Sequence, residues 1–374
     1  MSTSYDIAAY YWPAYHDDPR WRLFMPEGIG EWEIIRKSPS KFDGHHQPRV
    51  PVWGYTDESD PSVMETKIDA AAGHGVNVLI FDWYWYENQP FLEACLNRGF
   101  LEAPNNDRIK FYIMWANHEA PTVWDIERSH KYEVIWPGEV DQATFTIATD
   151  RLIDRYFGHP SYYTIDGKPV LSIYELSTLI NGLGGITPSR NALDDFRRRV
   201  RAAGFPGLHL QAILWDRIPG SAGMVPGDRT TTQANTIRAL GFDSLTNYQW
   251  CHYVNPSGAY EAWGETATVS WRKWVREFSV PFFPHVSIGW DTNPRYKALK
   301  SLVTGGTPEL FERYLRRATE FVDTHKLSPP LVTVNSWNEW SEGSYLEPDT
   351  THGLGYLEAV QNAVSASNKD PTIP

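Results

Sequence analysis

Eight short apolar stretches recur along the chain and predict β-strands. Several are continuous apolar runs, which is typical of strands buried on both faces of a sheet. Between them lie segments with apolar positions three or four residues apart, which indicates helices. The predicted strands cover residues 5–11, 76–82, 109–115, 168–174, 208–215, 242–248, 280–288 and 330–337. The predicted helices cover residues 61–75, 141–158, 192–204, 268–278, 308–325 and 353–366.

Eight strands alternating with helices predict a parallel sheet, and the number eight favours an α/β fold of the (β/α)8 TIM barrel type. The connections from helix to strand are short, whereas those from strand to helix are long, as in residues 12–60, 116–140, 216–228 and 249–266. A barrel gathers the strand-to-helix loops on one face, where active sites lie. A doubly wound sheet is the alternative, but it predicts no such asymmetry. We expect a single catalytic domain over residues 1–366 and a flexible tail over residues 367–374.

Aromatic and polar residues gather where the predicted strands end. The chain has 17 Trp, 20 Tyr and 16 Phe, and seven of the eight strands have a Trp at or near their end. Indole and phenol rings stack on sugar rings, while Asp, Asn and His bind hydroxyl groups. For any one Trp, core packing is an equally good explanation. For the set we predict a carbohydrate cleft formed by Tyr11, Trp12, His16, Asp82, Trp83, Trp85, Trp115, Asn117, His118, Tyr174, Trp215, Trp250, Trp290, Asp291, Trp337 and Asn338.

Two glutamates, Glu339 and Glu342, follow the eighth predicted strand in the segment WNEWSEG. Glycoside hydrolysis uses two carboxyl groups, and their separation sets the stereochemistry. On a helical turn, residues three apart share a face, whereas on a strand they point to opposite faces. Gly343 favours a turn here. Two close carboxylates also raise one pKa, which suits an acid/base role. The alternative is a pair of ordinary surface glutamates.

Composition excludes several other classes. The formal net charge is −12 and no basic block occurs, which argues against a nucleic-acid or anionic-membrane partner. The two cysteines, Cys95 and Cys251, and the lack of a signal peptide or of any apolar run of membrane-spanning length predict a cytoplasmic protein, unless a signal peptide has been removed. We expect no cofactor and no metal, because His45 and His46 form only an adjacent pair near Asp43. The oligomeric state is left open.

Several motifs resemble the WbsX family, which is labelled glycosyltransferase and is related to glycoside hydrolase family 99. They are AAYYWPAYH (8–16), GHHQPRVPVWGY (44–55), VLIFDWYWY (78–86), MWANHE (114–119), DGKPVLSIY (166–174) and WNEWSEGSYLEPD (337–349). The resemblance covers most of the chain and implies a (β/α)8 barrel that acts on glycans. It also implies that Glu339 is a base toward the substrate's own 2-hydroxyl and Glu342 a general acid, with an anhydro-sugar intermediate and net retention. Strand two reads FDWYW where relatives commonly have a histidine, and MWANHE departs from the usual pattern, so mannose specificity and the anhydro route are not carried over.

We therefore expect a retaining glycoside hydrolase that cleaves a poly- or oligosaccharide. The absence of D-x-D and of a phosphate-binding loop favours hydrolysis over glycosyl transfer. Two alternatives remain: a glycosyltransferase of surface-polysaccharide synthesis on the same fold, and a carbohydrate-binding barrel without catalysis. The sequence leaves open the sugar, its linkage, endo or exo action, and the choice between an anhydro-sugar and a covalent intermediate.

Overall fold

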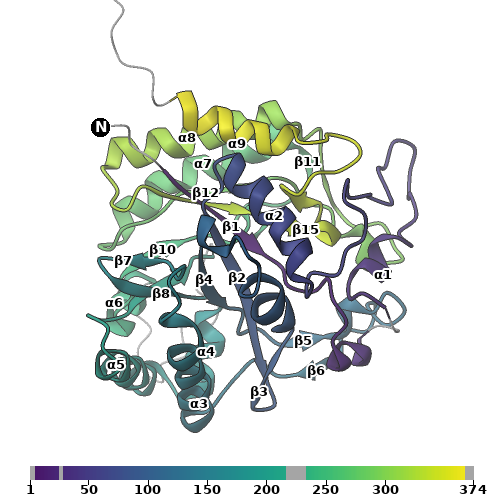
Figure 1. Cartoon of the computed structure of the whole chain (residues 1–374). Helices are drawn as coiled ribbons and strands as arrows, with labels where there is room; N and C mark the ends of the chain where they lie inside the picture. The colour runs from purple at the N-terminus through teal and green to yellow at the C-terminus, as the bar shows by residue number, and fades with distance from the viewer. Residues whose placement is uncertain (1–4, 25–27, 216–232, 367–374) are drawn as a thin grey trace, which may run out of the picture.

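The computed structural model describes residues 5–24, 28–215 and 233–366, and these form a parallel barrel surrounded by helices (Figure 1). The sheet runs in the order β10-β9-β8-β4-β2-β1-β14-β12. A parallel bridge between Leu245 and Phe282 joins β10 to the segment before β12 and brings the two ends of the sheet together. The strands are β1 (Asp6–Tyr11), β2 (Val78–Tyr86), β4 (Lys110–Trp115), β8 (Lys168–Ile173), β9 (His209–Ile213), β10 (Ser244–Thr246), β12 (His285–Ser287) and β14 (Leu331–Asn335).

The eight barrel strands coincide with the eight predicted ones, and the predicted TIM barrel is confirmed. β2 is buried along its whole length, and β9, β10, β12 and β14 are buried at every position. Burial on both faces explains why these strands are continuous apolar runs. The neighbouring parallel strands β1 and β2 pair in register from Ala8 with Val78 to Tyr11 with Phe81, which places the ends of both at one rim.

Helices cover the outside of the barrel. They are α1 (Trp32–Ile35), α2 (Pro61–Gly73), α3 (Gln142–Leu152), α4 (Leu176–Leu183), α5 (Ile186–Ala202), α6 (Gln233–Leu240), α7 (Tyr260–Glu277), α8 (Pro308–His325) and α9 (Gly355–Ala366). Figure 1 shows α8 and α9 along one side of the barrel and α3 and α5 along the opposite side.

Three helices differ from the prediction. α5 begins at Ile186, before the predicted start at residue 192. α7 begins at Tyr260, well before the predicted start at residue 268, because Trp263, Ala267 and Trp271 continue the buried face toward the N-terminus. The segment predicted as one helix over 141–158 continues past α3 as a π-helical turn, η5 (Ile153–Phe157). The short helices α1, α4 and α6 were not predicted, because one or two turns carry too few periodic positions to be recognised.

Short elements complete the loops. The small strands are β3 (Gln89–Phe91), β5 (Ala120–Pro121), β6 (Val134–Trp136), β7 (Thr164–Ile165), β11 (Gly258–Ala259), β13 (Val303–Thr304), β15 (Asn338–Glu339) and β16 (Ser344–Tyr345). The remaining 3-10 or π turns are η1 (Pro19–Leu23), η2 (Cys95–Phe100), η3 (Asn106–Arg108), η4 (Thr122–Trp124), η6 (Trp250–His252), η7 (Asn293–Arg295) and η8 (Trp340–Glu342). Most of them lie in the strand-to-helix connections, which are long at residues 12–60 and 116–140 as expected. The loop expected over 249–266 is shorter, because α7 begins at Tyr260. The expected loop 216–228 and the tail 367–374 lie outside the described residues.

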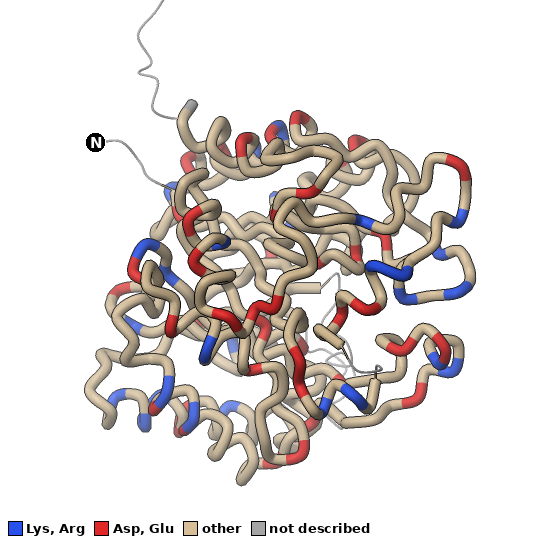
Figure 2. Tube along the Cα trace, turned by 45° about the vertical axis from the view of Figure 1, so that its right-hand side comes forward, with Lys and Arg blue, Asp and Glu red and all other residues tan. Residues whose placement is uncertain are grey.

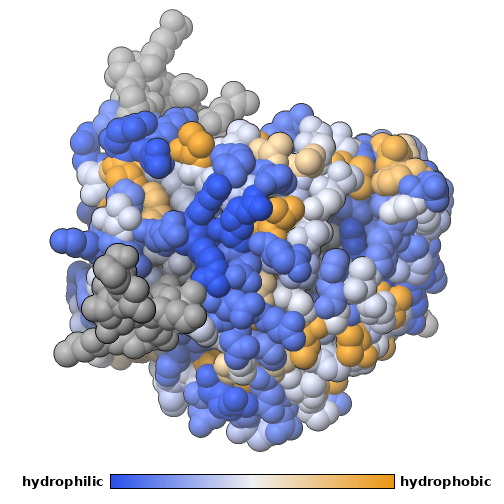
Figure 3. All heavy atoms as spheres, turned by 90° about the horizontal axis from the view of Figure 1, so that it is seen from above, coloured by the Kyte–Doolittle hydropathy of each residue, from blue (hydrophilic) through white to orange (hydrophobic). Residues whose placement is uncertain are grey.

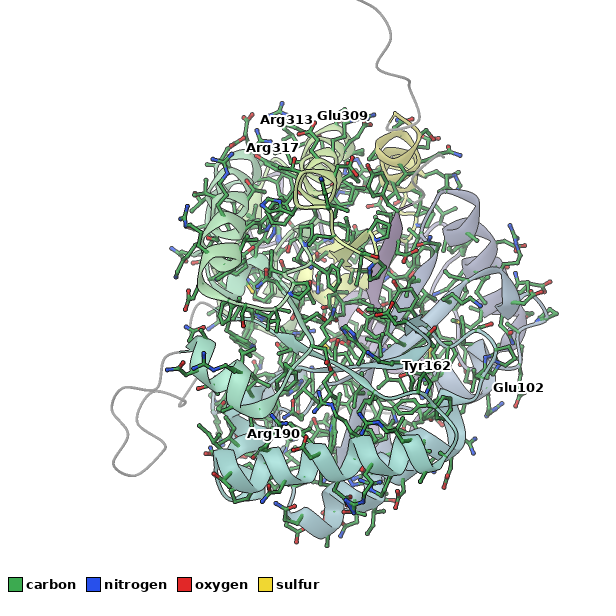
Figure 4. The ribbon with its side chains drawn as sticks, turned by 90° about the vertical axis from the view of Figure 1, so that its left-hand side faces the viewer. Glu102, Tyr162, Arg190, Glu309, Arg313 and Arg317 are labelled. Carbon is green, nitrogen blue, oxygen red and sulfur yellow. The ribbon has the colours of Figure 1, made fainter. Side chains whose placement is uncertain are left out.

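The outer helix surface is polar and charged. Arg313 and Arg317 on α8 pair with Glu261 and Glu265 on α7, and Arg190 lies on α5 on the opposite side of the barrel (Figure 4). Such exposed pairs contribute little to stability. Acidic and basic positions are spread over many elements (Figure 2), and the face seen from above is mostly hydrophilic with small scattered apolar groups (Figure 3). Within the described residues, no helix combines the length and the apolar character that crossing a membrane requires.

Candidate active site

The two glutamates of WNEWSEG lie on a tight turn after β14. Glu339 ends β15 and Glu342 ends the 3-10 turn η8, and Gly343 closes the turn with a φ of 65°. In a 3-10 turn, side chains three residues apart are brought onto one side. The amide of Glu339 donates to the hydroxyl of Ser336 at 2.7 Å, which ties the turn to the strand end. The turn expected from Gly343 is present.

One guanidinium group contacts both carboxylates. Arg295, on η7, donates from Nη1 to Glu342 at 2.7 Å and from Nη2 to Glu339 at 3.4 Å. The same Nη2 lies 3.3 Å from Glu31, and Nε donates to Ser341 at 2.8 Å. The side chain of Arg295 is almost completely buried. Glu339 and Glu342 are therefore held side by side through a planar fork that suits two carboxylates.

Burial controls the ionisation of these groups. It raises the pKa of Glu339 well above the usual carboxyl value, and the neighbouring charge of Glu342 raises it further. Burial also raises the pKa of Glu342, against which the close contact with Arg295 acts. The spacing predicted a raised pKa for one of the two carboxyl groups, whereas burial raises the pKa of both. The stronger shift at Glu339 follows from its deeper position and its longer contact with Arg295.

A cavity of about 830 Å³ opens over the turn. Its volume is in the range of sites that bind ligands of several rings. Seven of the predicted site residues line it: Trp12, Asp82, His118, Tyr174, Trp215, Glu339 and Glu342. Half-buried Trp215 is held flat against His252 at a ring distance of 3.7 Å, and its Nε1 donates to the carbonyl of Tyr174. This wall offers a fixed aromatic face.

The cavity is acidic. Its lining includes the carboxyl groups of Asp82, Glu119, Glu139, Glu175, Glu339 and Glu342. Among the described residues that line it, Arg295 is the one Lys or Arg. The field inside the cavity therefore favours neutral or positively charged ligands over phosphates.

Several predicted tryptophans pack away from the cavity. Trp83 donates to Glu93, Trp115 stacks on Phe145, and Trp250 donates to the carbonyl of His285 in the core. Among the predicted residues, Tyr11, His16, Trp83, Trp85, Trp115, Trp250 and Trp337 are buried and are not part of the cavity lining. Successive side chains of a strand alternate between its two faces, so a ring at a strand end has an equal chance of facing the surrounding helices.

Two predicted asparagines position backbone rather than line the cavity. Asn117 exchanges hydrogen bonds with the backbone of Glu175 at 2.8 Å in both directions. Asn338 does the same with Trp12, accepting from its amide at 2.8 Å and donating to its carbonyl at 2.9 Å. Both residues fix the loop that carries a cavity residue.

Trp290 and Asp291 line a second, smaller cavity of about 230 Å³. The carboxylate of Asp291 accepts from Arg49, His45 and Gln47, and its backbone amide donates to the carbonyl of Glu342 at 2.6 Å. Asp291 thus holds the backbone of the turn that carries Glu339 and Glu342. His45, one of the two adjacent histidines, is thus hydrogen-bonded to Asp291, while His46 contacts Thr351. Within the described part of the chain, no group of three His, Cys, Asp or Glu is placed to hold a metal ion.

Sequence reasoning missed three residues that the structure places at the site. The hydroxyl of Tyr248 is in hydrogen-bond contact with Asp82 and Glu339, and Arg295 binds both glutamates. Glu31 accepts from Trp12, Tyr15 and Ser341. Tyr248 stands at the end of the sixth predicted strand and was open to selection by the rule applied to the tryptophans. Arg295 and Glu31 lie in loops, where no periodic pattern marks them.

A buried ion cluster lies beneath the turn. Lys67 of α2 contacts Glu58 at 2.5 Å and Glu347 at 2.7 Å. Glu58 also accepts from Asn338 at 3.1 Å, and Glu347 accepts from the indole of Trp340 at 2.8 Å. Burial raises the pKa of Glu58 to about 7. The cluster therefore links the first long helix to two residues of WNEWSEG.

Comparison with known families identifies the chain. The family described as glycosyltransferase WbsX matches residues 7–360, and the chain belongs to this family. An uncharacterised protein named WxcX from Xanthomonas campestris pv. campestris is 26% identical over 374 residues, with 96% of this chain and 49% of that protein covered. Mouse glycoprotein endo-alpha-1,2-mannosidase is 23% identical over 362 residues, with 92% of this chain and 64% of that protein covered. The chain thus spans about half to two thirds of the length of these relatives.

Solved structures share the fold. An endo-alpha-mannosidase of glycoside hydrolase family 99 from Bacteroides thetaiotaomicron superposes with a TM-score of 0.59 at 14% identity, over 96% of both chains. A glycoside hydrolase-like protein superposes with a TM-score of 0.61 at 15% identity, over 96% of this chain and 94% of that one. Together with the mouse relative, they support the expected relation to glycoside hydrolase family 99.

Proposed function

We propose that this member of the WbsX family is a glycoside hydrolase that uses Glu339 and Glu342 as its acid/base pair. The observation that carries the proposal is the shared contact of both carboxyl groups with Arg295 inside the large cavity. Hydrolysis of a glycosidic bond needs two carboxyl groups close together, one to protonate the leaving oxygen and one to assist attack. The names of the mouse relative and of the solved mannosidase, both endo-acting on α-mannosides, support the reaction class.

We assign the general acid to Glu342 and the base or nucleophile to Glu339, with net retention. The pKa of Glu342 is raised by burial, which favours the protonated form that a general acid needs. The bond to Arg295 is 2.7 Å long and stabilises the carboxylate that remains after the proton has been given away. Glu339 lies deeper, with about 5% of its side chain exposed against 12% for Glu342. The less exposed position suits a group that contacts the sugar ring itself.

We propose a neutral glycan as substrate. Trp12, Trp124, Trp215 and Tyr174 provide rings for sugar stacking, and His118 and the cavity carboxyl groups provide partners for hydroxyl groups. Glu119 and Glu175 already accept hydrogen bonds from Tyr132 and from Thr178, which fixes their orientation. The cavity volume of about 830 Å³ holds more than one sugar residue.

Glycosyl transfer is the second candidate, because the family is described as a glycosyltransferase. Transfer from a sugar nucleotide requires a site for a diphosphate. The acidic lining opposes such a site, and Arg295 is already bound to three carboxylates. We therefore expect activity to survive prolonged treatment with EDTA. Loss of activity in EDTA that one divalent ion restores would favour transfer, since a metal would neutralise both the carboxylates and the diphosphate.

The experiment that tests the proposal is digestion of a panel of defined glycans, α-mannosides among them, with the anomer of the first product read by NMR. We expect cleavage of at least one glycan, with the product anomer matching that of the substrate. The matched control is the double variant Glu339→Gln and Glu342→Gln, which keeps the side-chain volumes. Cleavage with inversion would contradict the retaining assignment. Sugar binding without cleavage would favour the non-catalytic barrel.

A further inference from the structure

The hydroxyl of Tyr248 lies between two carboxyl groups. It is 3.0 Å from Oδ2 of Asp82 and 2.8 Å from Oε1 of Glu339. All three side chains are buried. A phenol has one hydrogen to donate, and an ionised carboxylate has none. Both short contacts are hydrogen bonds only if one of the two carboxyl groups is protonated and donates to the phenol oxygen.

Among the described residues, no Lys, Arg or His forms an ion pair with Asp82. Its Oδ1 lies within the protein without a hydrogen-bond partner among the described residues. The charged group that acts on Asp82 is Glu342, whose negative charge disfavours ionisation of Asp82. Burial raises the pKa of Asp82 well above the usual value. Burial also raises the pKa of Glu339, and the negative charge of Glu342 raises it further. Arg295 and Glu31 act on Glu339, but Arg295 binds it only at 3.4 Å. Holding a proton in this pair therefore costs less than ionising both groups.

The rings that pack on Tyr248 are neutral. Its ring packs on Tyr10 at 4.6 Å, on Tyr174 at 5.2 Å and on His252 at 5.9 Å. Burial lowers the pKa of His252 to about 3, so this imidazole carries no charge at neutral pH. The phenol is thus held rigidly by rings and is directed at the two carboxyl groups.

We propose that Asp82, Tyr248 and Glu339 form a chain that holds one proton and passes it from Glu339 to Asp82. In the transfer the O–H bond of protonated Glu339 breaks and its hydrogen bonds to the phenol oxygen. At the same time the phenol O–H bond breaks and its hydrogen bonds to Oδ2 of Asp82. The negative charge moves from Asp82 to Glu339, and no proton enters or leaves the protein.

This chain explains how Glu339 acts as a base although its surroundings favour the neutral form. A base must be ionised when the substrate hydroxyl reaches it. Transfer along the chain frees Glu339 without releasing the proton from the protein. The role of Glu339 rests on the proposed function, whereas the shared proton is a property of the unliganded protein. Asp82 and Tyr248 are positioning residues in this scheme, since they act through Glu339.

The test is carbon-13 NMR of protein labelled at the carboxyl carbons of Asp and Glu, at pH 7 and without substrate. Asp82→Asn and Glu339→Gln assign the two signals, and both keep the size of the side chain. We expect the two carboxyl groups together to hold one proton in the unaltered protein. Each substitution should then ionise the remaining partner, because the introduced amide donates to the phenol and the phenol donates onward. Two ionised carboxylates in the unaltered protein would overturn the proposal.

Tyr248→Phe separates a proton chain from simple repulsion between charges. Without the hydroxyl, replacing Asp82 or Glu339 by its amide should change the ionisation of the other carboxyl group less than it does in the unaltered protein. We also expect kcat to fall by about 10²-fold with little change in KM. Tyr10→Phe is the matched control, because this buried tyrosine donates to the carbonyl of Asn247 and contacts neither carboxyl group. If each substitution changes the ionisation of the other carboxyl group just as strongly in Tyr248→Phe, the proposed proton chain is contradicted. The NMR result stands even if no glycan is cleaved, so failure of the chain and failure of the hydrolase proposal are distinguishable.

Discussion

Arg295 is the residue on which the electrostatics of the site depend. Its fork contacts Glu31, Glu339 and Glu342, and a lysine has one ammonium group that cannot reproduce this geometry. We expect Arg295→Lys to lower kcat/KM by about 10²-fold, the loss typical of removing one fixed donor from an active site. Steady-state kinetics with a thermal melt measure it. Arg313→Lys on the outer surface is the control, and equal kinetics for the two variants would contradict the role of Arg295.

At the level of elements, Lys67 links helix α2 to the turn that carries Glu339 and Glu342, through Glu58 and Glu347. The substitution Lys67→Met keeps the length of the side chain but leaves Glu58 and Glu347 buried without their cation. We expect the free energy of unfolding to fall by about 3–5 kcal/mol. Denaturant titration measures this, and exposed Lys37→Met should stay within about 0.5 kcal/mol. A small change for Lys67→Met would show that the cluster gains nothing from the ammonium group.

The elements also show what the sequence could predict. The barrel strands were recognisable because each one is buried on both faces and reads as an apolar run, and the turn at Glu339 and Glu342 was recognisable from Gly343. The direction in which a side chain points at a strand end was not recognisable from the sequence. Trp83 and Trp115 were therefore assigned to the cleft, although they pack against Glu93 and Phe145.

Long-range pairs were equally hidden. Arg295 meets Glu339 across 44 positions of chain, and Glu31 meets Ser341 across 310. Such contacts depend on how loops are placed over the barrel rim, which local periodicity does not encode. The aromatic and acidic residues of the cavity were predictable as types, whereas the groups that orient them required the fold.

At the level of the whole molecule, the buried carboxyl group of Glu58 makes stability depend on pH. Burial raises its pKa from 4.5 to about 7, so between these values the folded protein holds a proton that the unfolded chain has lost. The free energy of unfolding must then fall as pH rises through this window. We expect the unaltered protein to lose up to about 3 kcal/mol relative to Glu58→Gln. Urea titrations of both proteins across this pH window measure the difference between their free energies of unfolding. A difference that does not change with pH would contradict the raised pKa of Glu58.

The proposed function requires Glu339 and Glu342 to have different roles in one cavity. The most direct test is kcat/KM of Glu339→Gln and Glu342→Gln, each with a substrate that has a poor leaving group and with an activated aryl glycoside. Glu342→Gln should lose about 10²–10⁴-fold with the poor leaving group and far less with the activated one, which needs little protonation. Glu339→Gln should lose activity on both. Equal losses in all four combinations would contradict the separate roles, and unchanged rates would contradict catalysis by this pair.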